Sequence, residues 1–226
     1  MSGASALLIL HLLLLVAWLG IDVGVFTSSF VMRRPGMSTE TRVVVRRLML
    51  SLDIAPRVSL ILMIPVALGL SRSTGWGLTS TPDWLFWTLG VLGAVWAWAS
   101  VVSVRRGVAG ATDGWVAAFS QLDQALRALA SLFFLASGVW SLVGSGPWLG
   151  GWLAWKATLF GVIIAAGLWI RRAAARYRPA LSELLEKGES PRRLMEVNRR
   201  IRGVYPPVLL VWCLLIVMVV LAVAKP

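Results

Sequence analysis

The sequence predicts an all-α integral membrane protein whose helices form one bundle. Of its 226 residues, 58% are hydrophobic and only 14% are charged, which is more apolar than a water-soluble domain of this size. Six stretches reach the roughly 20 apolar residues that a helix needs to cross a bilayer. Basic residues gather between alternate stretches, a pattern typical of chains that cross the membrane several times.

The six expected helices account for most of the chain. They cover approximately residues 6–31, 50–70, 84–104, 120–142, 149–170 and 204–224, and a basic cytoplasmic loop is expected at 171–203. Residues 1–226 are therefore predicted to form a single transmembrane domain. We expect a multi-pass protein of the bacterial cytoplasmic (inner) membrane, with membrane lipids as its constant partners.

The position of the charge is more informative than its sum of +12. Of the 22 lysines and arginines, 17 lie in three segments, at 33–47, 105–106 and 171–202. The positive-inside rule makes these segments cytoplasmic and places both termini on the opposite side. Because this charge marks topology and contact with lipid headgroups, nucleic-acid binding is not expected.

Two of the predicted helices begin alike, with "LDIAPRVSL" at 52–60 and "LDQALRALA" at 122–130. This repeat predicts a bundle of three parallel hairpins, which lacks the inverted symmetry of many transporters. Residues four apart share a helix face, so we expect neutral pairs between Asp53 and Arg57 and between Asp123 and Arg127. These pairs serve either as structural anchors or, together with Asp22, as a charged inner site.

The first predicted helix holds the only histidine of the chain, His11. His11, Leu15, Trp18 and Asp22 follow the spacing i, i+4, i+7, i+11, so they share one stripe of that helix. An imidazole and a carboxylate are unfavourable in lipid, and we expect this stripe to face the interior of the bundle.

Three other side chains lie at nearly the same depth as His11: Met63, Lys156 and Met218, about 8–10 Å below the outer surface. His and Met are ligands of haem iron and of Cu(I), and Lys156 can meet a propionate or another anion. Simple packing is the alternative for the methionines. The sequence shows no Cys-x-x-Cys, no Ser-His-Asp set and no phosphate-binding glycine loop, which argues against hydrolase and nucleotide chemistry.

Three segments resemble HemJ-type protoporphyrinogen oxidases and CopD-type copper-resistance membrane proteins. They are "LHLLLLVAWLGIDVGVF" (10–26), "GWLAWKATLFGVIIAAGLWIRR" (151–172) and "MEVNRRIRGVYPPVLLVWCLLIVMVVLAVAKP" (195–226). The chain departs from the HemJ pattern in having one histidine and six helices rather than four, with the third and fourth similar to an inserted hairpin.

The resemblance implies a haem b and an oxidoreductase activity toward a porphyrin or a membrane electron carrier. His11 matches the family's first-helix histidine and Lys156 its later lysine, and we add Trp18 and Arg57 to these candidate cofactor-binding residues. A CopD-like copper protein, with His11, Met63 and Met218 as metal ligands, is the first alternative. The second is a non-catalytic structural or assembly subunit, in a homo-oligomer or a larger membrane complex.

The charge distribution makes a direct prediction about topology. A reporter fused after Pro226, or inserted at Gly77, should read as non-cytoplasmic, because both sites lie opposite the three basic segments. Paired alkaline phosphatase and fluorescent protein fusions measure this, with a fusion at Gly188 as the cytoplasmic control. A cytoplasmic signal at Gly77 would contradict the assigned orientation.

Overall fold

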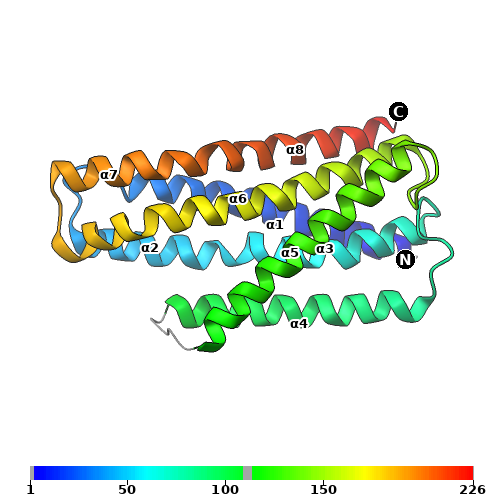
Figure 1. Ribbon diagram of the computed structural model, residues 1–226, viewed down its shortest axis with the longest axis horizontal. Helices are drawn as coiled ribbons and strands as arrows, with labels where there is room; N and C mark the ends of the chain where they lie inside the picture. Colours follow the sequence, from blue (N-terminus) through cyan, green and yellow to red (C-terminus); the bar gives the residue numbers. More distant parts are fainter. Residues whose placement is uncertain (1–2, 109–113, 226) are drawn as a thin grey trace.

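The chain folds into long helices that run side by side, as Figure 1 shows. The computed structural model describes residues 3–108 and 114–225. Pro226, which was expected to lie on the non-cytoplasmic side, is outside the described residues. The helices are α1 (Gly3–Val31), α2 (Thr39–Leu52), α3 (Ile54–Ser73), α4 (Asp83–Val108), α5 (Gly114–Leu142), α6 (Gly151–Lys187), α7 (Pro191–Ile201) and α8 (Tyr205–Ala224), with a short 3₁₀ turn, η1 (Arg202–Val204), before α8.

Within residues 3–108 and 114–225, six helical segments are long and apolar enough to cross a membrane. They are Gly3–Val31, Thr39–Ser73, Asp83–Gly107, Gly114–Leu142, Gly151–Lys187 and Pro191–Ala224. Each overlaps one of the six helices expected from the sequence over most of its length. The prediction of an all-α fold with six long apolar helices is therefore confirmed, while the three-hairpin repeat and the side on which the termini lie stay predictions.

The polar segment 171–203 is helical, and the expectation of a loop there is wrong. α6 continues to Lys187, and α7 follows after a short turn. Ser190 caps α7, because its hydroxyl accepts a hydrogen bond from Arg193 N at 3.3 Å. The buried face of α7 consists of Leu194, Val197 and Ile201. A search for continuous apolar stretches misses such a helix because only one of its faces is apolar.

The turn between α1 and α2 is fixed by a buried arginine, Arg42, which is 1% exposed. Its guanidinium donates to the carbonyl oxygens of Met32 at 3.2 Å and Arg34 at 3.0 Å, and it forms an ion pair with Glu189 at 2.5 Å. The α1–α2 turn and the α6–α7 turn are thereby joined. We call this end of the bundle, with both turns and α7, the basic end; it is on the left in Figure 1.

The opposite end carries the α3–α4 and α5–α6 connections and the free ends of α1 and α8 (Figure 1). The two connections meet there, because Leu149 N donates to Trp76 O at 2.7 Å and Gly77 pairs with Trp148. Trp152 lies edge-on to Trp76, with ring centroids 5.6 Å apart. We call this the tryptophan end.

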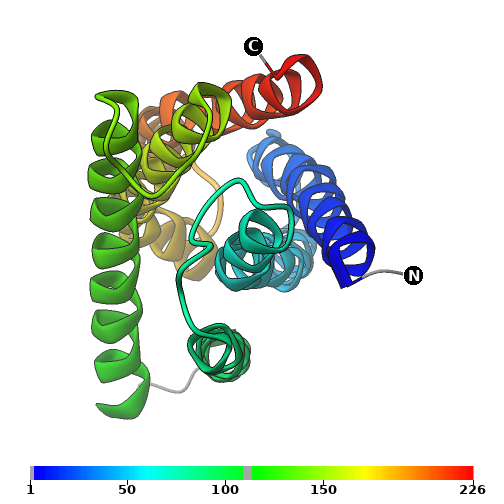
Figure 2. The same ribbon diagram turned by 90° about the vertical axis from the view of Figure 1, so that its right-hand side faces the viewer.

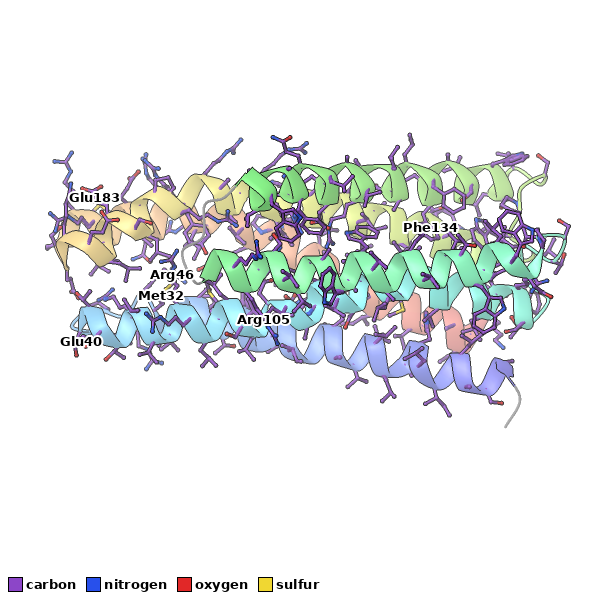
Figure 3. All side chains as sticks on the ribbon, turned by 90° about the horizontal axis from the view of Figure 1, so that it is seen from below. Met32, Glu40, Arg46, Arg105, Phe134 and Glu183 are labelled. Atoms are coloured by element: carbon purple, nitrogen blue, oxygen red, sulfur yellow. The ribbon has the colours of Figure 1, made fainter. Side chains whose placement is uncertain are left out.

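The largest apolar cluster occupies the half of the bundle nearer the tryptophan end, and α1, α3, α5, α6 and α8 all contribute to it. Phe134 and Phe160 meet edge to face at its centre, with ring centroids 4.9 Å apart, and Trp18 packs on Phe160. Figure 3 shows Phe134 in this half, while the labelled charged residues Arg46 and Glu183 lie toward the basic end.

Helices α5 and α6 form a V that is closed toward the tryptophan end. They approach closely where Gly138 faces Thr158 and where Ser131 Oγ donates to Gly161 O at 2.8 Å. Toward its N-terminal end, α5 diverges from α6, as Figure 1 and the view from the tryptophan end in Figure 2 show. The mouth of the V thus lies toward the basic end.

The closed part of the V requires glycine at position 138. A Cβ there would lie 2.6 Å from Thr158 N, so Gly138→Ala forces the two backbones apart. We expect a destabilisation of about 1–3 kcal/mol, the usual range for overpacking, seen as a lower midpoint of thermal unfolding in detergent. Gly167→Ala is the matched control, because nothing lies within 4 Å of a Cβ at Gly167. Equal midpoints for both variants would contradict the contact.

Candidate functional site

The predicted stripe of α1 faces the bundle. Trp18 is 4% exposed and belongs to the main apolar cluster, against which Leu15 also packs. Asp22 Oδ2 accepts a hydrogen bond from Trp212 Nε1 of α8 at 2.7 Å. The stripe therefore runs from His11, near the tryptophan end, to a polar contact with α8 nearer the basic end.

His11 has a buried nitrogen without a partner. Among the described residues, no donor or acceptor lies within hydrogen-bond distance of His11 Nδ1. The side chains one turn to either side, Leu7 and Leu15, pack against the main apolar cluster, so the imidazole lies at the border of that cluster. The charge of Lys156 on α6 is close enough to act on the imidazole electrostatically.

Lys156 is a half-buried cation on α6. Its Nζ lies 5.7 Å from the centroid of the Trp152 ring, and Lys225 Nζ lies 5.9 Å from the same centroid. In the described part of the chain, no carboxylate is within ion-pair distance of Lys156, and Trp152 Nε1 is buried without a hydrogen-bond acceptor. This end of the bundle therefore offers an ammonium, an indole N–H and an imidazole to a negatively charged group.

Met63 and Met218 both belong to the apolar half of the bundle in which His11 lies. Met63 on α3 is 4% exposed and lies inside the cluster, and Met218 on α8 packs against its edge. No group of three or more His, Cys, Asp or Glu able to hold a metal ion occurs within residues 3–108 and 114–225. A metal here would depend on one imidazole and on thioethers, which are ligand types that suit haem iron and Cu(I).

Both predicted ion pairs form nearer the basic end. Asp53 lies at the junction of α2 and α3, and its Oδ2 accepts from Arg57 Nε at 2.7 Å. Asp123 on α5 accepts from Arg127 Nε at 3.2 Å. The structure places Arg57 in this group of charges, paired with Asp53, and not in the contacts around His11.

Asp123 has two further partners that sequence spacing does not predict. Trp96 Nε1 of α4 donates to its Oδ1 at 2.7 Å, and Arg171 Nη2 of α6 meets its Oδ2 at 2.5 Å. Arg171 directly follows the helix expected at 149–170, at the start of the segment that was expected to be a loop. The expected helix ends at residue 170, whereas α6 continues to Lys187. Arg171 therefore lies inside a helix that packs against α5.

We call Asp53, Arg57, Asp123, Arg127 and Arg171 the charged layer. Arg57 and Arg171 each act electrostatically on Arg127, so the two ion pairs influence one another. Asp22 lies near enough to Asp53 for the two carboxylates to interact, but its hydrogen bond comes from Trp212 and no basic side chain pairs with it among the described residues. Asp22 is therefore a neighbour of the charged layer and not part of an ion pair.

The fold and the two polar regions define a multi-pass helical bundle of the membrane type, with an imidazole near one end and charged pairs toward the other. Comparison with protein-family models, with curated proteins and with solved structures finds no match to this chain. The functional assignment therefore depends on the site residues.

The two ion pairs differ in burial, and this predicts different sensitivities. Asp123→Asn should destabilise the protein by about 3–5 kcal/mol, because Arg127 would lose its buried counter-charge. The Asp53 carboxylate is 26% exposed, so Asp53→Asn should cost about 1 kcal/mol or less. Thermal unfolding of the purified variants measures both.

A double-mutant cycle shows whether each pair interacts. The change Asp53→Ala with Arg57→Leu should recover part of the stability that Asp53→Ala loses, since no unpaired charge remains. The same cycle on Asp123 and Arg127 should show a larger coupling. Losses that simply add in both cycles would contradict the pairing.

Proposed function

We propose that this protein binds haem b near the tryptophan end of the bundle and takes part in membrane electron transfer. The observation that carries the proposal is His11 Nδ1, a buried nitrogen with no partner in the described structure, within electrostatic range of the cation of Lys156. The sequence resemblance to HemJ-type oxidases supports the same two residues. A porphyrin or a membrane electron carrier is the redox partner that this class implies.

The side chains around His11 suit such a group. Haem needs an axial nitrogen or sulfur ligand, an apolar surface for the macrocycle and a cation for its carboxylates. His11 offers the nitrogen, Met63 or Met218 offers a sulfur, and the cluster that contains Trp18 offers the apolar surface. Lys156 and the indole N–H of Trp152 would bind a propionate. When bound, haem supplies the one-electron redox chemistry.

Copper handling is the second candidate. Met63 and Met218 border the cluster on which His11 lies, and thioether and imidazole ligands favour Cu(I). The two candidates share His11 but differ in what else they need. Haem requires the apolar surface and a cation for its carboxylates, whereas Cu(I) requires both sulfurs and gains nothing from Lys156.

The absorption spectrum of the purified protein separates these candidates. A Soret band is expected for haem, and His11→Ala should abolish it or convert it to a loosely held high-spin form. Met63→Leu or Met218→Leu should shift the band only if that sulfur is the second axial ligand. Met195→Leu is the control, because Met195 is 70% exposed on α7 at the basic end.

Metal analysis completes the test. Copper is the bound metal if the protein contains stoichiometric copper and shows no Soret band. In that case His11→Ala, Met63→Leu and Met218→Leu should each lower the copper content. A haem spectrum unchanged in His11→Ala would overturn the ligand assignment. A protein with neither haem nor copper would leave a structural or assembly role.

A further inference from the structure

The charged layer holds more positive than negative charge. Arg57 balances Asp53, but Asp123 alone faces both Arg127 and Arg171. Within these five residues one positive charge is left over, and the carboxylate of Asp22, which lies near Asp53, accepts its hydrogen bond from Trp212 and not from a guanidinium. A bound negative group would remove this surplus.

An unsatisfied donor marks the place where that group would bind. Arg127 is 4% exposed, and its Nη2 is buried without an acceptor in the described parts of the chain. Its guanidinium lies 5.7 Å from the centroid of the Trp96 ring, so one face is covered by an aromatic side chain. A buried N–H of a guanidinium strongly favours an acceptor, and none of the residues in 3–108 and 114–225 supplies one.

Two of the three guanidiniums in the charged layer are partly exposed. Arg171 of α6 spans the mouth to reach Asp123 of α5, and its side chain is still 19% exposed. Arg57 on α3 is 25% exposed, whereas Arg127 is almost fully enclosed. Solvent therefore reaches Arg57 and Arg171 but hardly reaches Arg127.

From these observations we propose that the charged layer binds a phosphate group between Arg57, Arg127 and Arg171. Guanidinium groups donate planar pairs of N–H bonds, and a tetrahedral phosphate presents enough oxygens to accept from three of them at once. Arg171 is followed on α6 by Arg172, Arg176 and Arg178, which raise the local concentration of anions near the charged layer. The group therefore comes either from the head of an anionic phospholipid or from free phosphate.

The surroundings also accommodate the rest of a lipid. Leu122 and Leu129 of α5 flank Asp123 and Arg127 and are 53% and 64% exposed, so apolar surface for acyl chains adjoins the charged layer. This inference is independent of haem, because the charged layer and the His11 region share no residue.

Binding measurements on the full-length protein in neutral detergent test the proposal. Phosphatidylglycerol in mixed micelles should raise the midpoint of thermal unfolding and be retained in native mass spectrometry, more than phosphatidylcholine does. Arg171→Gln should bind phosphatidylglycerol roughly tenfold more weakly, because it removes the surplus charge and one donor pair. Arg172→Gln is the matched control, since Arg172 is the exposed neighbour on the same helix.

The two sources of phosphate give different results. If only inorganic phosphate stabilises the protein, and Arg171→Gln abolishes this effect, the ligand is free phosphate. If only phosphatidylglycerol stabilises the protein, the ligand is the lipid head. Arg171→Lys keeps the charge near Asp123 but lacks the planar fork, so it should fold and bind with intermediate strength. Equal responses of the wild type and both Arg171 variants to either probe, or an equal loss in Arg172→Gln, would overturn the proposal.

Discussion

The carboxylate of Asp123 is the contact on which the arrangement of half the bundle depends. A negative charge inside an apolar helix bundle is tolerated only when neighbouring groups neutralise it and donate to its oxygens. Trp96, Arg127 and Arg171 do this from α4, α5 and α6. Trp96 and Arg171 thereby link α4 and α6 to α5, whereas Arg127 acts within α5, so one side chain joins three helices.

The other contacts of the bundle follow a related division. Toward the tryptophan end, close packing holds the helices together, with glycine and serine where α5 meets α6 and aromatic rings at the centre of the cluster. At the basic end, Arg42 holds the two turns together by donating to backbone carbonyls and pairing with Glu189. Between these regions lies the charged layer. Polar contacts therefore increase toward the end where the basic residues gather.

The sequence predicts contacts within a helix far better than contacts between helices. Apolar length identifies all six spanning helices, and the i, i+4 spacing identifies the pairs of Asp53 with Arg57 and of Asp123 with Arg127. The third ligand of Asp123, Arg171, lies 48 positions away on α6, and its position depends on the angle at which α5 leaves α6. α7 was missed for another reason: its apolar residues are spaced for one face, and no continuous apolar stretch marks it.

The length of α6 has a mechanical consequence. Its 37 residues extend about 55 Å, and the hydrocarbon core of a bilayer is about 30 Å thick, so a helix of this length exceeds such a core by roughly 25 Å. Arg171, Arg172, Arg176 and Arg178 therefore lie on a helix and not on an irregular loop, and the helical backbone sets the spacing between their charges.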